Sequence, residues 1–196
     1  MVSLSKNQTI SLAKQSSALS QIQFGLGWDP VKKKGGFLGG LFGGGSDSID
    51  LDASCVLLDA QGKVIDTVSF RQLSSKDGAI VHTGDNLTGE GDGDDEVIKA
   101  DLSRLSPNVE FLALTVNSFR GQTFNEVDNA FCRVLDQSSK ELGRFRLTEQ
   151  GSHTGVLIAS LRRSGGEWNF TAHGLACTGR TVEEMMSQIV AAVVNG

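Results

Sequence analysis

Residues 52–70 read DASCVLLDAQGKVIDTVSF, two apolar runs on either side of a short turn. The turn is Asp59-Ala-Gln-Gly62, and Gly62 can adopt the positive φ that a tight reversal needs. We therefore expect strands over 52–58 and 64–70 that pair as a β-hairpin. A hairpin of this kind places the chain among antiparallel β structures.

Comparable runs recur along the rest of the chain, separated by turn-forming residues. The chain has 24 Gly and only 2 Pro, which favours strands and turns over a helical bundle. The near-regular spacing predicts a mainly β protein, an antiparallel β-sandwich of two sheets with few short helices and a C-terminal helix. The further expected strands are 9–12, 22–26, 79–82, 96–101, 110–118, 130–136, 141–147, 155–163 and 167–173.

Helical signals are confined to two places. Residues 123–129 predict a turn or a short helix. Residues 181–194 predict an amphipathic helix, because Thr181 and Glu184 form a capping-box pattern ahead of an apolar stripe. We expect the stripe to dock on the body of the protein, the alternative being a contact face for a partner. Its members are Val182, Met185, Met186, Ile189, Val190 and Val193.

The length of 196 residues suits a single domain, 1–196, interrupted by a glycine-rich insertion at 32–48. The insertion is too rich in glycine to hold a regular element. It carries four large apolar side chains directly after three lysines: Phe37, Leu38, Leu41 and Phe42. Two interpretations stay open, in which these side chains fold back on the body or contact a membrane surface or a partner groove.

Charge and cysteine usage narrow the function classes. A net charge of -5 argues against a nucleic-acid binder, which needs a broad basic face. The chain opens without a signal-peptide pattern and has no run near the roughly 20 apolar residues of a membrane span, so we expect a cytoplasmic protein. Cys55, Cys132 and Cys177 follow no paired spacing, which predicts reduced and mostly buried thiols.

The acidic charge is concentrated in residues 84–96, GDNLTGEGDGDDE, which hold six acids and no base. In extended backbone Glu90, Asp92, Asp94 and Glu96 project to one side, and Asp95 faces away. Carboxylates this close repel one another unless a cation lies among them. The interleaved glycines let backbone carbonyls join the carboxylates, and an irregular set of oxygen donors suits Ca²⁺.

Further oxygen donors occur at strand ends elsewhere in the chain. Asp29 closes one expected strand, and Asp50 and Asp52 open another. In a sandwich these residues can gather with the acidic run at one tip, where together they can hold two Ca²⁺ ions. The alternative is an acidic loop that is only solvated. An EF-hand is excluded, because its later ligands and its flanking helices are missing.

Enzymatic chemistry has little support in the residues. His82, His153 and His173 are scattered without metal-ligand spacing, and no Gly-x-Ser-x-Gly motif is present. The enzymatic alternative is a calcium-dependent enzyme whose tip orients a phosphate or another anionic substrate. A non-enzymatic protein can use calcium either as a regulatory ligand or as a permanent structural ion, and affinity distinguishes the two.

Three motifs, FGLGWD at 24–29, IDLDAS at 49–54 and VHTGDNLTGEGDGDDE at 81–96, together resemble the TerD family of bacterial tellurium-resistance and stress proteins. The resemblance runs from about Met1 to His173. It implies a two-sheet sandwich, calcium binding and no firmly assigned catalysis. It also implies partners among other tellurium-resistance proteins, in a partly membrane-associated system against tellurite, phage and some colicins, with peripheral association at the inner membrane. Carried onto matching positions, the calcium region is Asp29, Asp50, Asp52, Asp85, Asn86, Glu90, Asp92, Asp94, Asp95 and Glu96.

Overall fold

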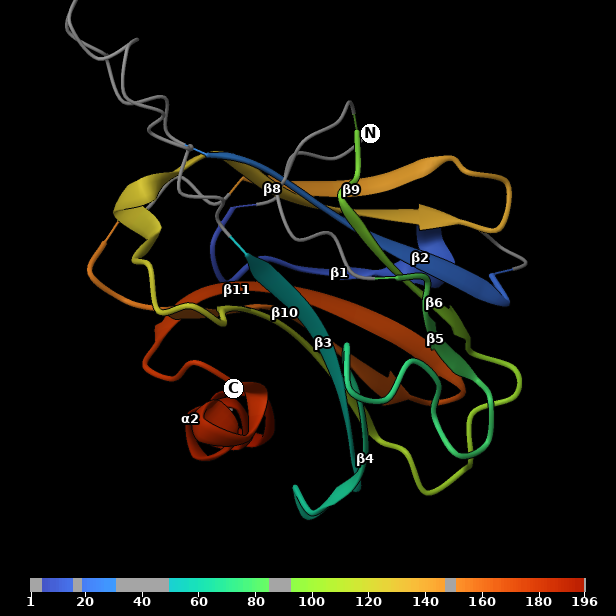
Figure 1. Cartoon of the computed structure of the whole chain (residues 1–196). Helices are drawn as coiled ribbons and strands as arrows, with labels where there is room; N and C mark the ends of the chain where they lie inside the picture. The colour runs from blue at the N-terminus through green and yellow to red at the C-terminus, as the bar shows by residue number, and fades with distance from the viewer. Residues whose placement is uncertain (1–4, 16–18, 31–49, 85–92, 147–150, 196) are drawn as a thin grey trace, which may run out of the picture.

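Two antiparallel β-sheets stack face to face, and one helix lies on the outer side of the larger sheet (Figure 1). The computed structural model describes residues 5–15, 19–30, 50–84, 93–146 and 151–195. The mainly β, two-sheet fold class with a C-terminal helix is therefore confirmed. The glycine-rich insertion, with Phe37, Leu38, Leu41 and Phe42, lies outside the described residues.

The larger sheet has six strands, and every pairing in it is antiparallel. In spatial order they are β1 (Thr9–Ser11), β11 (Glu167–Cys177), β10 (Gly155–Ser164), β7 (Phe111–Ser118), β3 (Leu51–Leu58) and β4 (Val64–Val68). The hairpin expected over 52–70 is the β3–β4 pair. Gly62 has φ 77°, and the Asp59 carboxylate accepts hydrogen bonds from the backbone N of Gln61 and Lys63.

The smaller sheet has five strands, also all antiparallel. In spatial order they are β5 (Ile80–His82), β6 (Glu96–Asp101), β2 (Gln21–Pro30), β8 (Val127–Asp136) and β9 (Glu141–Arg146). Strand β2 is longer than expected and takes in the whole 24–29 motif. It can do so because the register with β8 shifts between Gly27 and Asp29, which keeps the motif within the ladder.

The helices are α1 (Leu12–Gln15), the 3₁₀ turn η2 (Phe124–Glu126) and α2 (Val182–Asn195). The expected strand at 9–12 is wrong at its last residue, because Leu12 begins α1, where its side chain is fully buried. The short helix expected within 123–129 is confirmed as η2. None of the helices in the described ranges is both long enough and apolar enough to cross a membrane.

The main core lies between the sheets and is made by alternate side chains of both, such as Phe24 of β2, which stacks on Phe170 of β11 with ring centroids 6.4 Å apart. Cys55 and Cys132 are unpaired and buried, and burial raises the pKa of each thiol to about 12. Cys177 is also buried and unpaired. The expectation of reduced, buried thiols is confirmed for all three.

Helix α2 covers a second apolar cluster on the outer face of the six-stranded sheet (Figure 1). Four members of its stripe are buried, Val182, Met185, Ile189 and Val193, against side chains of β3, β7 and β10. At its start, Glu184 accepts a hydrogen bond from the backbone N of Arg180 at 2.8 Å. The expectation that the stripe docks on the body is confirmed.

Candidate functional site

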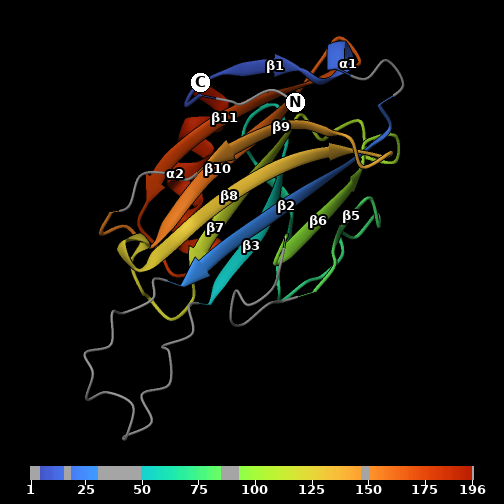
Figure 2. The same ribbon diagram turned by 90° about the horizontal axis from the view of Figure 1, so that it is seen from above.

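The described residues among the expected ligands lie at one end of the sandwich, where β2 ends and where β3 and β6 begin (Figure 2). The antiparallel pairing of β2 with β6 sets Leu26 opposite Glu96. This brings the motif at 24–29 beside the end of the acidic run. Four of the expected ligands, Asp85, Asn86, Glu90 and Asp92, lie outside the described residues.

Asp29 and Asp95 form the acidic pair at this end. The backbone N of Asp95 donates to Leu26 O at 2.8 Å, and its Oδ2 accepts from the backbone N of Trp28 at 2.9 Å. Asp29 Oδ2 accepts from Asn129 Nδ2 at 2.8 Å. Burial raises the pKa of Asp95, and the neighbouring carboxylates of Asp29 and Asp94 raise it further, against the lowering effect of the Trp28 hydrogen bond. Negative charge is therefore costly to hold at Asp95.

Asp94 lies on the outer face of the five-stranded sheet. Arg133 of β8 donates to both of its carboxylate oxygens, from Nε at 2.8 Å and from Nη2 at 2.9 Å. The carboxylate rests over Gly25, where any Cβ would collide with it. A glycine at position 25 is thus required by the place that Asp94 occupies. A bidentate arginine supplies much of the compensating charge that a metal ion would otherwise provide.

Glu96 points the opposite way, into the space between the sheets. Its Oε2 accepts a hydrogen bond from the backbone N of Ala53 at 2.7 Å and lies 3.2 Å from His82 Nε2. The expectation that Asp94 and Glu96 project to one side is therefore wrong for this pair. Strand β6 begins only at Glu96, and Gly93 has φ 107°, so the alternation of a regular strand does not extend back to Asp94.

Asp52 belongs to β3 of the six-stranded sheet, and Asp50 directly precedes that strand. Asp52 alternates with the core residues Leu51 and Ala53, so its side chain faces the outer side of the sheet, where Asn117 Nδ2 donates to it at 3.2 Å. Asp50 accepts from Arg120 Nε at 3.3 Å. Both are buried. The structure places them at the expected end of the sandwich, but Asp52 faces away from the interior that holds Glu96.

A metal would need donors from several segments. Within the described ranges, no three Asp, Glu, His or Cys side chains converge closely enough to hold a metal by themselves. Asp29 and Asp95 nevertheless fit a hard cation in chemistry, since they are neighbouring carboxylates whose mutual repulsion an ion would relieve. The residues at 85–92 connect directly to this pair along the chain.

Four polar residues that hold the acids in place were not anticipated from the sequence: Asn117, Arg120, Asn129 and Arg133. One signal was available, because Arg133 interrupts the apolar stretch 130–135 of β8, where a charged side chain is unusual unless a carboxylate faces it. The three histidines lie apart, as expected. His82 contacts Glu96, His173 contacts Ser160 at 2.8 Å, and His153 stacks on Phe124.

Comparison with known proteins places these features in a family. The model of the TerD domain matches residues 1–188. Tellurium resistance protein TerZ of Serratia marcescens is 71% identical over 195 residues, which cover 100% of both chains. Stress response protein SCP2 of Bacillus subtilis is 41% identical, over 96% of this chain and 99% of its own.

A solved structure shares the fold. It is a homologue of telluride resistance protein (TerD) from Streptomyces coelicolor, with a TM-score of 0.69 and 22% identity over 85% of this chain and 95% of that one. Within the family, the first residues and the glycine-rich insertion resemble those of TerZ-type members, and the full-length identity of 71% confirms this resemblance. Because the family model spans nearly the whole chain and full-length relatives share the sequence, the protein belongs to the TerD family.

Proposed function

We propose that this protein is a non-enzymatic calcium-binding module of a tellurite and stress resistance system. The observation that carries the calcium proposal is the pair Asp29 and Asp95. Burial raises the pKa of Asp95, and the neighbouring carboxylates of Asp29 and Asp94 raise it further. The names of the relatives, a tellurium resistance protein and a stress response protein, support the biological role.

In this proposal Asp29 and Asp95 hold the ion together with the acids of the run at 85–92. Calcium supplies positive charge and a centre that oxygen donors from separate segments can share. The end of β2 and the segment before β6 already meet through the hydrogen bonds of Asp95 to Leu26 and Trp28. Asp50 and Asp52, at the start of β3 in the other sheet, are the ligands that a second ion would use.

The consequence of binding is an ordered end of the sandwich that docks to other tellurium-resistance proteins or to a membrane surface. Mass action sets the scale, because an ion present at 100 times its Kd stabilises the folded state by about 2.7 kcal/mol. An ion bound at the resting calcium level of a cell would act as a structural staple. A weaker site would respond to changes in calcium.

The test is calorimetric titration of chelator-stripped protein with CaCl₂, repeated with MgCl₂. We expect calcium-selective binding that the double variant Asp29→Asn/Asp95→Asn loses. The matched control is Glu167→Gln, which removes a carboxylate from an exposed position on β11. Absence of calcium binding in the unmodified protein, or equal binding in the double variant and the control, would refute the assignment.

A further inference from the structure

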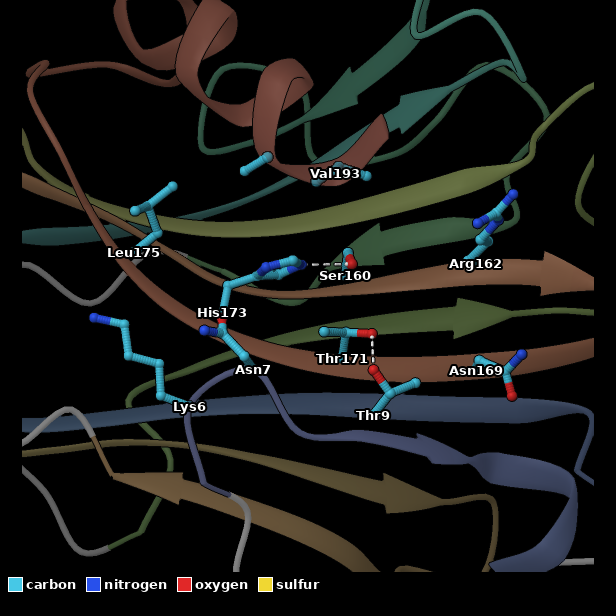
Figure 3. A pocket seen from close by; sticks show the side chains of 11 residues that line it. Lys6, Asn7, Thr9, Ser160, Arg162, Asn169, Thr171, His173, Leu175 and Val193 are labelled. Carbon is cyan, nitrogen blue, oxygen red and sulfur yellow. Dashed lines mark hydrogen bonds between the residues drawn. The ribbon is translucent and has the colours of Figure 1, made fainter. Parts of the chain in front are cut away.

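The outer face of the six-stranded sheet changes character where α2 stops covering it. Under the helix the outward side chains are apolar, among them Leu58, Phe111 and Leu157. Beyond the helix, the outward side chains are mostly polar, among them Thr9 of β1, Thr171 and His173 of β11 and Arg162 of β10. They line a pocket of about 620 Å³ beside the last turns of α2 (Figure 3). This volume lies within the range of small-molecule sites.

The polar side chains of the pocket are rich in hydrogen-bond donors. Lys6 and Arg162 lie toward opposite ends, with Thr171 and His173 between them (Figure 3). None of the described residues that line it is acidic. Glu110 lies 3.9 Å from Arg162 Nε and offsets part of its charge, but that arginine side chain stays 62% exposed. A concave surface with two cations, several donors and no carboxylate among its described lining residues attracts negative charge.

Two hydrogen bonds hold the floor of the pocket in a defined arrangement. Ser160 Oγ, which is buried, lies 2.8 Å from His173 Nε2, and Thr9 Oγ1 lies 2.8 Å from Thr171 Oγ1. Both bonds join neighbouring strands of one rigid sheet, so a ligand would meet donors already in position. Leu175 and Val193 add an apolar wall on the side of α2 (Figure 3).

We propose that this pocket binds a small organic anion of the phosphate-ester class, held between Lys6 and Arg162. Lys6 and Arg162 donate charge-assisted hydrogen bonds to the anionic groups of the ligand, and the hydroxyl groups of Thr9 and Thr171 contact its polar body. Part of the ligand packs against Leu175 and Val193. The pocket lies on the outer face of the six-stranded sheet, whereas Asp29 and Asp95 lie at one end of the five-stranded sheet. Ligand binding in the pocket therefore does not depend on calcium.

The test is a two-dimensional NMR titration of the calcium-stripped protein, freed of chelator by gel filtration. The probes are inorganic phosphate, ribose 5-phosphate and AMP, each phosphate ester paired with its neutral counterpart, ribose or adenosine. We expect the phosphate esters to shift the amide signals of Thr171 and His173, and the neutral counterparts to leave them in place. The anion should also raise the pKa of His173, visible as a shifted pH titration of its ring signals.

Charge-matched variants identify the site. Lys6→Gln/Arg162→Gln is expected to weaken phosphate-ester binding at least tenfold. Lys99→Gln/Lys140→Gln, which removes the same charge from exposed positions elsewhere, should leave binding unchanged. Lys6→Gln alone serves as the second variant, because an exposed side chain near the chain start can be replaced without unfolding. The proposal is overturned if no probe binds, if ribose binds as well as its phosphate, or if both double variants lose binding equally.

Discussion

Glu96 and Ala53 connect the two sheets, because the backbone N of Ala53 in β3 donates a hydrogen bond to Glu96 Oε2 of β6 at 2.7 Å. The same carboxylate contacts His82, and neither side chain of that pair is accessible to solvent. The last residue of the acidic run is thus part of the core. Its contacts tie the end that carries Asp29 and Asp95 to the opposite sheet.

Replacing Glu96 by Ala is expected to lower the free energy of unfolding by about 3 kcal/mol, since it leaves the buried amide of Ala53 and the His82 ring without this acceptor. Glu96→Gln, which keeps an acceptor oxygen, should cost less. Urea denaturation measures both. Glu167→Ala is the surface control, expected within about 0.5 kcal/mol of the unmodified protein. A loss below 1 kcal/mol for Glu96→Ala would show that the bridge between the sheets is not important for stability.

Arg133→Gln is expected to destabilise the calcium-free protein by about 2 kcal/mol, because Asp94 loses a bidentate cation while only 9% exposed. Calcium should then stabilise this variant more than the unmodified protein, since the ion takes over the missing charge. Thermal unfolding with and without CaCl₂ measures the difference. Arg104→Gln is the control, because Arg104 follows the end of β6 that is opposite to Glu96, where its Nη2 donates to Asp77 O. An identical calcium-induced shift in Arg133→Gln and in the unmodified protein would contradict this coupling.

Stability is expected to depend on pH through His173, whose pKa burial lowers from its usual value. The unfolded chain therefore binds a proton at about pH 6.5, before the folded protein does. The free energy of unfolding falls as the pH drops from about 6.5 toward the pKa of His173 in the folded protein. The stability that comes from keeping this histidine neutral is fully present above about pH 6.5. His173→Gln removes it, so urea midpoints of the variant should change less between pH 7 and pH 5. Parallel curves for the two proteins would rule the effect out.

Met185→Ala is expected to destabilise the protein by about 3 kcal/mol, because a fully buried side chain between α2 and the sheet is replaced by a cavity. Met185 also fills the space beside Gly155, where any Cβ would collide with its sulfur. Ser187→Ala, exposed on the same helix, is the control and should have almost no effect. If unfolding curves show equal stability for both variants, α2 contributes little to the fold.

Local patterns in the sequence were sufficient to predict most of the strands and the C-terminal helix. The hairpin at 52–70, the helix after Thr181 and most strand bounds follow from apolar periodicity and turn residues, which act between near neighbours. The family motifs likewise predicted the fold class and the end of the sandwich where acids gather. These features need no knowledge of distant contacts. The calcium ligands expected at 85–92 stay predictions, because they lie outside the described residues.

The directions and partners of the acidic side chains depended on tertiary structure. Asp94 and Glu96 are two residues apart, yet one pairs with Arg133 outside the sheet and the other with Ala53 inside it. Strand pairing between segments far apart in the chain decides which donors face each carboxylate. The pocket between Lys6 and Arg162 has the same origin, since its two cations are brought to one face only by the pairing of β1, β11 and β10. The sequence alone determines the local preference of each segment for strand, turn or helix. Which donor or cation faces each carboxylate is determined only when the two sheets assemble.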